Sequence, residues 1–270
     1  MPAEQETVLL YISHLHKQGI GYGSLKVHLA AIRNINIING YAPLDNTEPK
    51  LKLAMKAIQE SAPAPSQKLP LTFSKLKILW PFVKKDINSH MWQAVLCLAF
   101  FGGLRCSEYA ASGVVSKHLI PRVSSITFTT EGVMKYKVAR SKTKSHGMSV
   151  TLGCSQAEIC APCTMIKYLK SRGTTSHVKA DSYLFTLQHM PLSASNVNTF
   201  IGSLVQAVGW DSTKYSAHSL RAGAASSAAL AGFQDWELKK MGGWESKAYM
   251  SYIREQDSTV AGFAKRLVNM

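Results

Sequence analysis

Apolar residues recur at helical spacing along most of the chain, and polar gaps separate these stretches. Residues 4–38 carry two such stripes, divided by Gly19-Ile20-Gly21, with Ser24 as the expected N-cap of the second. Residues 51–58 form a shorter helical pattern. The segment 61–70 is rich in proline and small polar residues, so we expect a linker there. The pattern predicts a helical domain over residues 1–60 and a second domain over residues 71–270.

Beyond the linker the pattern predicts a second group of helices, one of them buried. The expected helices cover residues 72–83, 91–101, 161–169, 193–208, 222–231 and 236–241. The helix over 91–101 is apolar on all sides, which is typical of a helix at the centre of a domain. A short apolar segment covers 183–185, and a last segment carries Tyr249 and Tyr252.

Residues 123–152 change to a period of two, which is typical of strands. We expect strands over 123–128, 133–139 and 148–152, with a turn at Glu131-Gly132. The fold class is therefore mostly α with a small antiparallel β-sheet. The second hairpin is strongly basic and contains no acidic residue between its first and last lysine: Lys135, Lys137, Arg140, Lys142 and Lys144. This charge favours contact with a DNA groove or backbone, although a charged sheet edge that prevents aggregation is the alternative.

The overall charge points to an anionic partner. The net charge is +15 and the isoelectric point about 9.6, which favours nucleic acid. Residues 69–270 contribute +13 of this charge; Lys50, Lys52 and Lys56 in the first domain are interpreted as a solvated helix face. We find no apolar run of 18 residues and no secretory leader, so we expect a protein that is neither membrane-bound nor secreted.

Cysteines raise the question of a metal site. The chain has 5, an odd number that fits a reducing compartment. Cys154, Cys160 and Cys163 suggest zinc, with His146 or His177 as a fourth ligand. However, only one C-x-x-C pair is present, and Pro162 favours the start of a helix. From the sequence we expect neither a metal site nor a cofactor.

The stretch 215–254 concentrates groups that suit a phosphate. Imidazole, guanidinium, indole N–H and phenol groups occur there, and these bind a phosphate better than a carbonyl or a metal. In a helix His218 and Arg221 would share a face. Each group also has a structural interpretation, as a core histidine, a packed tryptophan or one more helix aromatic. The set comprises His218, Arg221, Trp244, Tyr249 and Tyr252.

This pattern of residues resembles the carboxy-terminal half of tyrosine recombinases, the phage-integrase family. His218-x-x-Arg221 is followed by Gly243-Trp244 and Tyr252, and the segment from Trp244 to Arg254 is most similar to recombinases of eukaryotic transposons. Upstream, Gly103-Leu104-Arg105-Cys106-Ser107-Glu108 resembles the family's G-L-R-x-S-E signature, and Ser141-Lys142-Thr143 resembles its catalytic hairpin. The resemblance implies a tyrosine recombinase catalytic domain preceded by a short helical DNA-clamping domain.

The resemblance also implies roles for these residues. Arg105 and Arg221 would hold the phosphate, with Glu108 supporting the region of Arg105; an Arg105–Glu108 pair without that function is the alternative. Tyr252 would be the nucleophile in preference to Tyr249. Lys142 would protonate the leaving 5′ oxygen, His218 would act in proton transfer, and the Trp244 N–H would hold a phosphate oxygen or the wall of the site. No acidic cluster is present to hold Mg²⁺, so the arginines would replace a metal.

The implied partner is double-stranded DNA, bound by a DNA-dependent homo-oligomer. The tail over residues 255–270 has apolar residues at helical spacing and would dock on a neighbouring copy or pack on its own domain. If the source is eukaryotic, as the resemblance implies, we expect a nuclear protein, and otherwise a cytoplasmic one. Two other functions remain open from the sequence: relaxation of DNA by a type IB topoisomerase, and DNA binding without catalysis by a transposon-derived domain.

Overall fold

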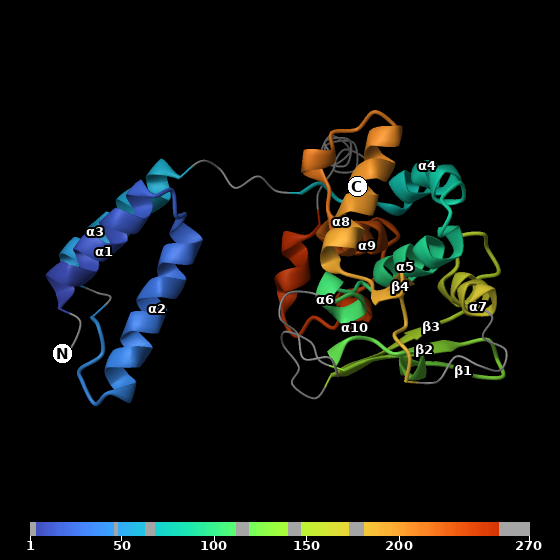
Figure 1. Cartoon of the computed structure of the whole chain (residues 1–270), viewed down its shortest axis with the longest axis horizontal. Helices are drawn as coiled ribbons and strands as arrows, with labels where there is room; N and C mark the ends of the chain where they lie inside the picture. The colour runs from blue at the N-terminus through green and yellow to red at the C-terminus, as the bar shows by residue number, and fades with distance from the viewer. Residues whose placement is uncertain are drawn as a thin grey trace, which may run out of the picture. The chain divides into compact units, whose positions relative to one another are not determined.

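The chain divides into two compact units, Met1–Ser66 and Gln67–Met270. The computed structural model describes residues 4–45, 48–62, 68–111, 119–139, 147–172 and 181–253. Figure 1 shows a helical first unit and a larger second unit that combines helices with a sheet. Among the described residues, no helix has the length and apolar character needed to cross a membrane.

The first unit is built from α1 (Gln5–Lys17), α2 (Tyr22–Ile38) and α3 (Pro49–Ser61), each in contact with the other two. Their apolar stripes meet in a core that contains Ile12, Leu25 and Leu51. The predicted N-cap at Ser24 is wrong. Its N–H already bonds the Gly21 carbonyl at 3.0 Å, so the helix has begun and Gly21 is the cap.

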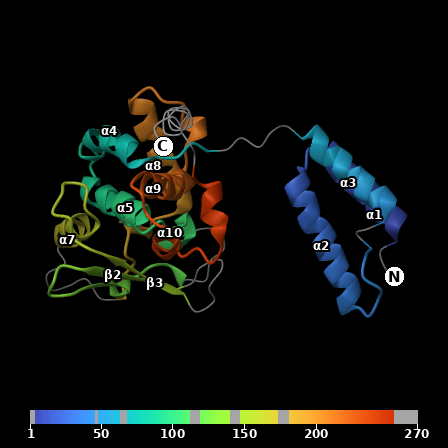
Figure 2. The ribbon, with the colours of Figure 1, turned by 180° about the vertical axis from the view of Figure 1, so that it is seen from behind.

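The helices of the second unit surround a buried centre. They are α4 (Phe73–Val83), α5 (Ser89–Phe101), α6 (Cys106–Tyr109), α7 (Ala161–Ser171), α8 (Ala194–Ala207), α9 (Ala217–Leu230) and α10 (Asp235–Gly242). The helix α5 is buried along most of its length, as its sequence predicts. In the opposite views of Figures 1 and 2, α9 lies in the middle of the unit, and it packs against α4, α5, α8 and α10.

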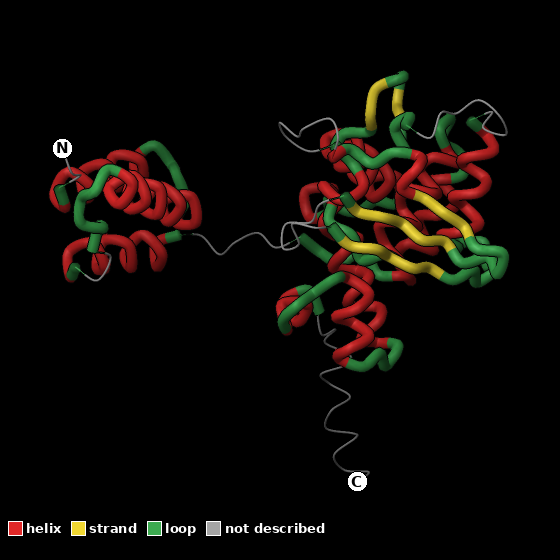
Figure 3. Tube along the Cα trace, turned by 90° about the horizontal axis from the view of Figure 1, so that it is seen from below, coloured by secondary structure: helices red, strands yellow, loops and turns green. Residues whose placement is uncertain are grey.

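A three-stranded antiparallel sheet lies across one side of these helices (Figure 3). Its order is β1 (Ile126–Phe128), β2 (Met134–Val138), β3 (Met148–Leu152). Tyr136 and its neighbours of the same parity are buried, whereas Lys135 and Lys137 are exposed on the opposite face. A second, two-stranded hairpin pairs β4 (Thr186–Leu187) with β5 (Met190–Pro191).

The structure confirms a mostly α fold with a small antiparallel sheet and corrects two local predictions. Residues Val123–Ser125 form a 3₁₀ turn, η2, because the Ser125 N–H bonds back to Arg122 at 2.9 Å, so the strand begins only at Ile126. The helix α9 begins at Ala217, five residues before the predicted start, since Ser216 caps it. The last segment is a 3₁₀ helix, η4 (Lys247–Ser251), and another, η3 (Ser212–Lys214), precedes α9.

Candidate active site

The first turn of α9 fixes His218 and Arg221. Ser216 caps the helix in a capping box with Ser219, and the Asn198 amide oxygen accepts the Ala217 N–H at 2.8 Å. These bonds satisfy donors that would otherwise be open at a helix start. The helix can lie this deep because Gly223 has no side chain: a Cβ there would come within 1.7 Å of the Leu71 carbonyl oxygen. Its first turn therefore projects His218 and Arg221 from a rigid base.

The Arg221 side chain joins two loops that are far apart in the sequence. It is fully buried, and its Nη1 donates to the carbonyl oxygens of Gly103, after α5, and Gly242, at the end of α10. Its guanidinium carbon lies 4.1 Å from the centre of the Trp244 ring. A Cβ on Gly242 would fall 1.9 Å from that ring, so only glycine allows the indole to approach. Arg221 thus contacts both the loop that leads to Arg105 and the Trp244 ring through one guanidinium.

Much of the hydrogen-bonding capacity of Arg221 is left open. Its Nε and Nη2 atoms, and the Trp244 Nε1, are buried without an acceptor among the described residues. Burial, followed by the charge of Arg105, lowers the pKa of Arg221. A buried donor without a partner costs about 1–3 kcal/mol. An anion with several oxygens would remove this cost, and a phosphate matches the guanidinium in shape and charge.

Arg105 is held by its own helix start. It caps α6, where the Glu108 carboxylate accepts its backbone N–H at 2.8 Å and its Nη1 at 3.0 Å. The Glu108 side chain is completely buried, whereas that of Arg105 keeps 21% of its surface exposed. The Tyr136 hydroxyl on β2 donates to the Glu108 carbonyl. The sheet, α6 and Arg105 are therefore fixed to one another.

His218 and Tyr252 complete the group around Arg221. Their rings meet edge to face at 5.1 Å, and the Tyr252 ring lies 5.9 Å from Trp244 and 5.7 Å from the Arg221 guanidinium carbon. Restricted hydration, followed by the charges of Arg221 and Arg105, lowers the pKa of His218 below its usual 6.5. The imidazole is consequently neutral at pH 7 and able to accept a proton.

Tyr249 differs from Tyr252 in its surroundings. It is buried, its ring packs against Trp244 at 6.1 Å, and its hydroxyl donates to the Asp235 carboxylate on α10. This bond raises the pKa of Tyr249. Tyr252 follows η4 as its C-cap and is partly exposed beside His218. Of the two phenols, only Tyr252 has its ring beside both His218 and the Arg221 guanidinium among the described contacts.

Comparison with known proteins identifies the family of the second unit. Residues 70–258 match the model of the phage integrase family. The chain belongs to this family. Its members are the tyrosine recombinases, which are DNA strand transferases, so the resemblance to them is confirmed.

Individual relatives are also recombinases. A curated integrase/recombinase xerD homologue of Selenomonas ruminantium is 28% identical over 240 residues, which are 85% of this chain and 67% of that protein. Solved structures share the fold at low identity. The Tn1549 transposon integrase with circular intermediate DNA has a TM-score of 0.63 and 15% identity, over 97% of this chain and 86% of that one. XerH in a post-cleavage complex with its difH substrate has a TM-score of 0.65 and 14% identity, over 97% and 72%.

In this tyrosine recombinase the predicted hairpin residues Arg140, Lys142 and Lys144 lie outside the described residues. The strand ends on either side of them are described. The strands β2 and β3 are antiparallel, with Val138 opposite Met148. A Cβ on Gly243 would lie 2.9 Å from the Met148 sulfur. The loop that carries Lys142 therefore starts beside the turn that leads into Trp244.

Two features of this recombinase were not predicted from the sequence. One is a cavity of about 630 Å³ bounded by α5, β3, α9 and α10. The other is a groove of about 770 Å³ between α2 and α3 of the first unit, lined by Lys26, Arg33, Lys52 and Lys56. Two of the lysines assigned to a solvated helix face thus line a concave basic surface. Their charge was visible in the sequence, but its convergence depends on how α2 packs against α3.

Proposed function

We propose that this recombinase binds double-stranded DNA and breaks and rejoins it at a specific site through a 3′-phosphotyrosyl link to Tyr252. One observation carries the proposal: the buried Arg221 guanidinium has open donors, and Arg105, His218, Trp244 and Tyr252 surround it. The Tn1549 integrase and XerH structures are DNA complexes, which supports DNA as the substrate here.

The reaction needs no external energy source. The Tyr252 oxygen attacks the phosphorus and the bond to the 5′ oxygen breaks, which leaves a 3′-phosphotyrosyl link and a 5′-hydroxyl. His218 takes part in moving the phenolic proton, and Lys142 protonates the departing oxygen. Arg105 and Arg221 bind the non-bridging oxygens, whose charge grows in the transition state. Attack by a 5′-hydroxyl of the other DNA strand reverses the chemistry and completes exchange.

The first unit supports this proposal as a DNA clamp. Lys26, Arg33, Lys52 and Lys56 are all exposed along the groove between α2 and α3. Converging basic side chains of this kind bind phosphates and release counterions. We therefore assign residues 1–60 to a helical core-binding domain that contacts the DNA, residues 61–70 to the linker, and residues 71–270 to the catalytic domain.

The assay that tests the function traps the covalent intermediate. The full chain is incubated with nicked suicide DNA in excess EDTA, and protein–DNA adducts are separated on a denaturing gel. We expect adducts in EDTA and exchange between two sites on intact DNA. Relaxation without exchange would indicate a topoisomerase, binding without adducts would indicate a non-catalytic protein, and activity that needs Mg²⁺ would refute the arginine mechanism.

Nuclear localisation and a transposon origin are part of the same proposal. They rest on the similarity of the segment from Trp244 to Arg254 to recombinases of eukaryotic transposons, and on the shared fold with a transposon integrase. The curated relative is bacterial, and a source of that kind would place the protein in the cytoplasm instead. Imaging of the tagged full chain in cells of its source organism distinguishes the two.

The exposed lysines of β2 should contact the DNA backbone and not its bases. Lys135 and Lys137 alternate with buried residues and point to solvent. For the Lys135→Ala/Lys137→Ala double variant we expect weaker binding to every sequence. The slope of log affinity against log salt should become shallower by about 0.9 for each phosphate that the variant no longer neutralises. Lys84→Ala is the control, because Lys84 bonds Glu158 at 2.6 Å. An altered sequence preference with an unchanged slope would contradict this prediction.

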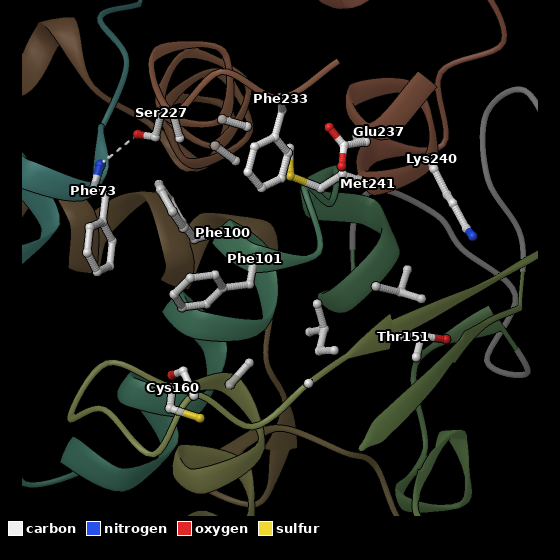
Figure 4. A pocket seen from close by; sticks show the side chains of 18 of the residues that line it. Phe73, Phe100, Phe101, Thr151, Cys160, Ser227, Phe233, Glu237, Lys240 and Met241 are labelled. Atoms are coloured by element: carbon white, nitrogen blue, oxygen red, sulfur yellow. Dashed lines mark hydrogen bonds between the residues drawn. The ribbon is translucent and has the colours of Figure 1, made fainter. Parts of the chain in front are cut away.

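Assembly is proposed to use the cavity of the second unit. Figure 4 shows Phe100, Phe101 and Phe233 around it, and the exposed part of Phe233 gives an apolar entrance. The tail 255–270, which lies outside the described residues, has apolar residues at helical spacing in its sequence. We propose that the tail of a neighbouring copy occupies the cavity when DNA brings copies together.

Deleting residues 258–270 tests this assembly. Two-site exchange should fall much more than single-site cleavage, because each copy keeps its own catalytic residues. Phe233→Glu should have the same selective effect, since a charge would be desolvated on docking. Both activities are measured on the same DNA preparation. Equal loss of cleavage and exchange would mean that the tail packs on its own domain.

A further inference from the structure

Three cysteines converge where β3 leads into α7. Cys154 follows the strand, Cys160 is the N-cap of α7 and Cys163 lies in its first turn. Their sulfur atoms all lie within 4.8 Å of one another, with 3.2 Å between Cys154 and Cys163 and 3.8 Å between Cys154 and Cys160. Among the described residues this is the only group of three or more potential metal ligands. None of its members belongs to the group around Arg221, and Cys160 borders the cavity shown in Figure 4.

We propose that these three thiols bind one Zn²⁺ ion. Zinc takes thiolates at about 2.3 Å in a tetrahedron, which places the sulfur atoms about 3.8 Å apart. The Cys154–Cys160 distance already has this value, and the Cys154–Cys163 distance needs to open by about 0.6 Å. The sequence predicts no metal because it shows a single C-x-x-C pair. The fold supplies the third thiol from the preceding loop.

The surroundings of the three thiols suit a zinc site that is open to solvent on one side. Cys160 is buried, Cys163 is intermediate and Cys154 is exposed, so the group faces solvent at Cys154. No histidine or carboxylate completes it among the described residues. A water molecule would take the fourth position. On binding, the three thiols release three protons to solvent, and the Zn(Cys)₃(H₂O) centre carries one negative charge.

The N-terminus of α7 favours that charge. Cys160, the N-cap of α7, lies where backbone N–H groups and the helix dipole stabilise anions. Zinc is preferred to a disulfide because a disulfide joins two sulfur atoms, whereas three converge here. The site ties the end of β3 to α7, which packs on the buried α5. We expect bound zinc to stabilise the second unit without taking part in strand cleavage.

The test measures metal and not recombination. The full chain is purified under reducing conditions, stripped with a strong chelator, and titrated with Zn²⁺ or Co²⁺. We expect about one ion per chain, a cobalt spectrum with thiolate charge-transfer bands and tetrahedral intensity, and a melting temperature that rises with free zinc. The Cys154→Ser/Cys163→Ser variant should lose these signals. Cys106→Ser is the matched control and should keep them.

A second measurement does not depend on the folding of variants. Zinc should protect Cys154, Cys160 and Cys163 of the wild-type chain from alkylation, as mapped by mass spectrometry, but should not change the labelling of Cys106. Equal metal content in the double variant and the wild type would overturn the proposal. So would a reduced wild-type chain that binds no zinc. A chain that keeps a Cys154–Cys163 disulfide after purification under reducing conditions would also overturn it. Neither result would bear on the phosphotyrosyl assay.

Discussion

Tyr252→Phe is expected to abolish the covalent protein–DNA adduct while DNA affinity stays nearly unchanged. The substitution removes only the nucleophilic oxygen, and the ring contacts with His218 and Trp244 remain. Adduct formation is measured on nicked suicide DNA, and affinity on intact DNA at one stated salt concentration. A single oxygen therefore separates binding from chemistry.

Tyr249→Phe is the matched control, three residues away in the same segment. The Tyr249 hydroxyl is engaged by Asp235, which Lys239 also pairs at 2.6 Å, so its loss leaves the carboxylate partnered. This variant should still form adduct. The linked peptide is then identified by mass spectrometry in the wild type. DNA attached to Tyr249 would reverse the assignment of the nucleophile.

Arg221→Lys is expected to slow single-turnover cleavage by on the order of 10²–10³-fold, the usual cost of losing one well-placed transition-state donor. Lysine keeps the positive charge but not the planar fork that reaches two carbonyls and a phosphate together. Adduct formation is followed over time with enzyme in excess, so that only binding and the first chemical step are observed.

Arg172→Lys controls for the general cost of changing a packed arginine. Arg172 resembles Arg221 in its contacts: its Nη1 donates to the carbonyls of Tyr183 at 3.0 Å and Leu184 at 2.8 Å, and it lies over the Tyr168 ring. These contacts of Arg172 include none of the proposed catalytic residues. Thermal unfolding of both variants separates destabilisation from lost chemistry. Cleavage rates within a few-fold of each other would show that Arg221 acts only through the fold.

Much of the fold was predictable because apolar residues recur at regular helical or strand spacing along the sequence. The buried α5 and the strand β3 follow from uninterrupted apolar or alternating patterns. The errors occur where a few hydrogen bonds decide the local conformation. The turn Val123–Ser125 resembles a strand by spacing, yet the Ser125 backbone bonds back to Arg122. The four-residue α6 is too short to show a period at all.

The sequence predicted which residues belong to the site better than it predicted how they are arranged. His218, Arg221, Trp244 and Tyr252 do lie together, and their individual roles stay predictions. The sequence could not show that Gly103 and Gly242 meet at one guanidinium, because this contact joins loops from opposite ends of the domain. The same limit applies to the basic groove of the first unit. Each depends on packing between segments whose local patterns are unrelated.

The position of Arg221 affects which residues would be retained in related proteins that have lost recombinase activity. Its guanidinium holds the turn after α5 to the end of α10, so the folded domain needs this side chain whether or not DNA is cut. The Tyr252 ring contacts His218 and Trp244, and the Tyr252 carbonyl accepts a hydrogen bond from the Ser226 hydroxyl, which any residue at this position could accept. A lineage that abandoned strand exchange would keep the arginine and be free to change the tyrosine. On the proposed mechanism, an arginine at 221 marks the architecture, and the phenol at 252 marks a working recombinase.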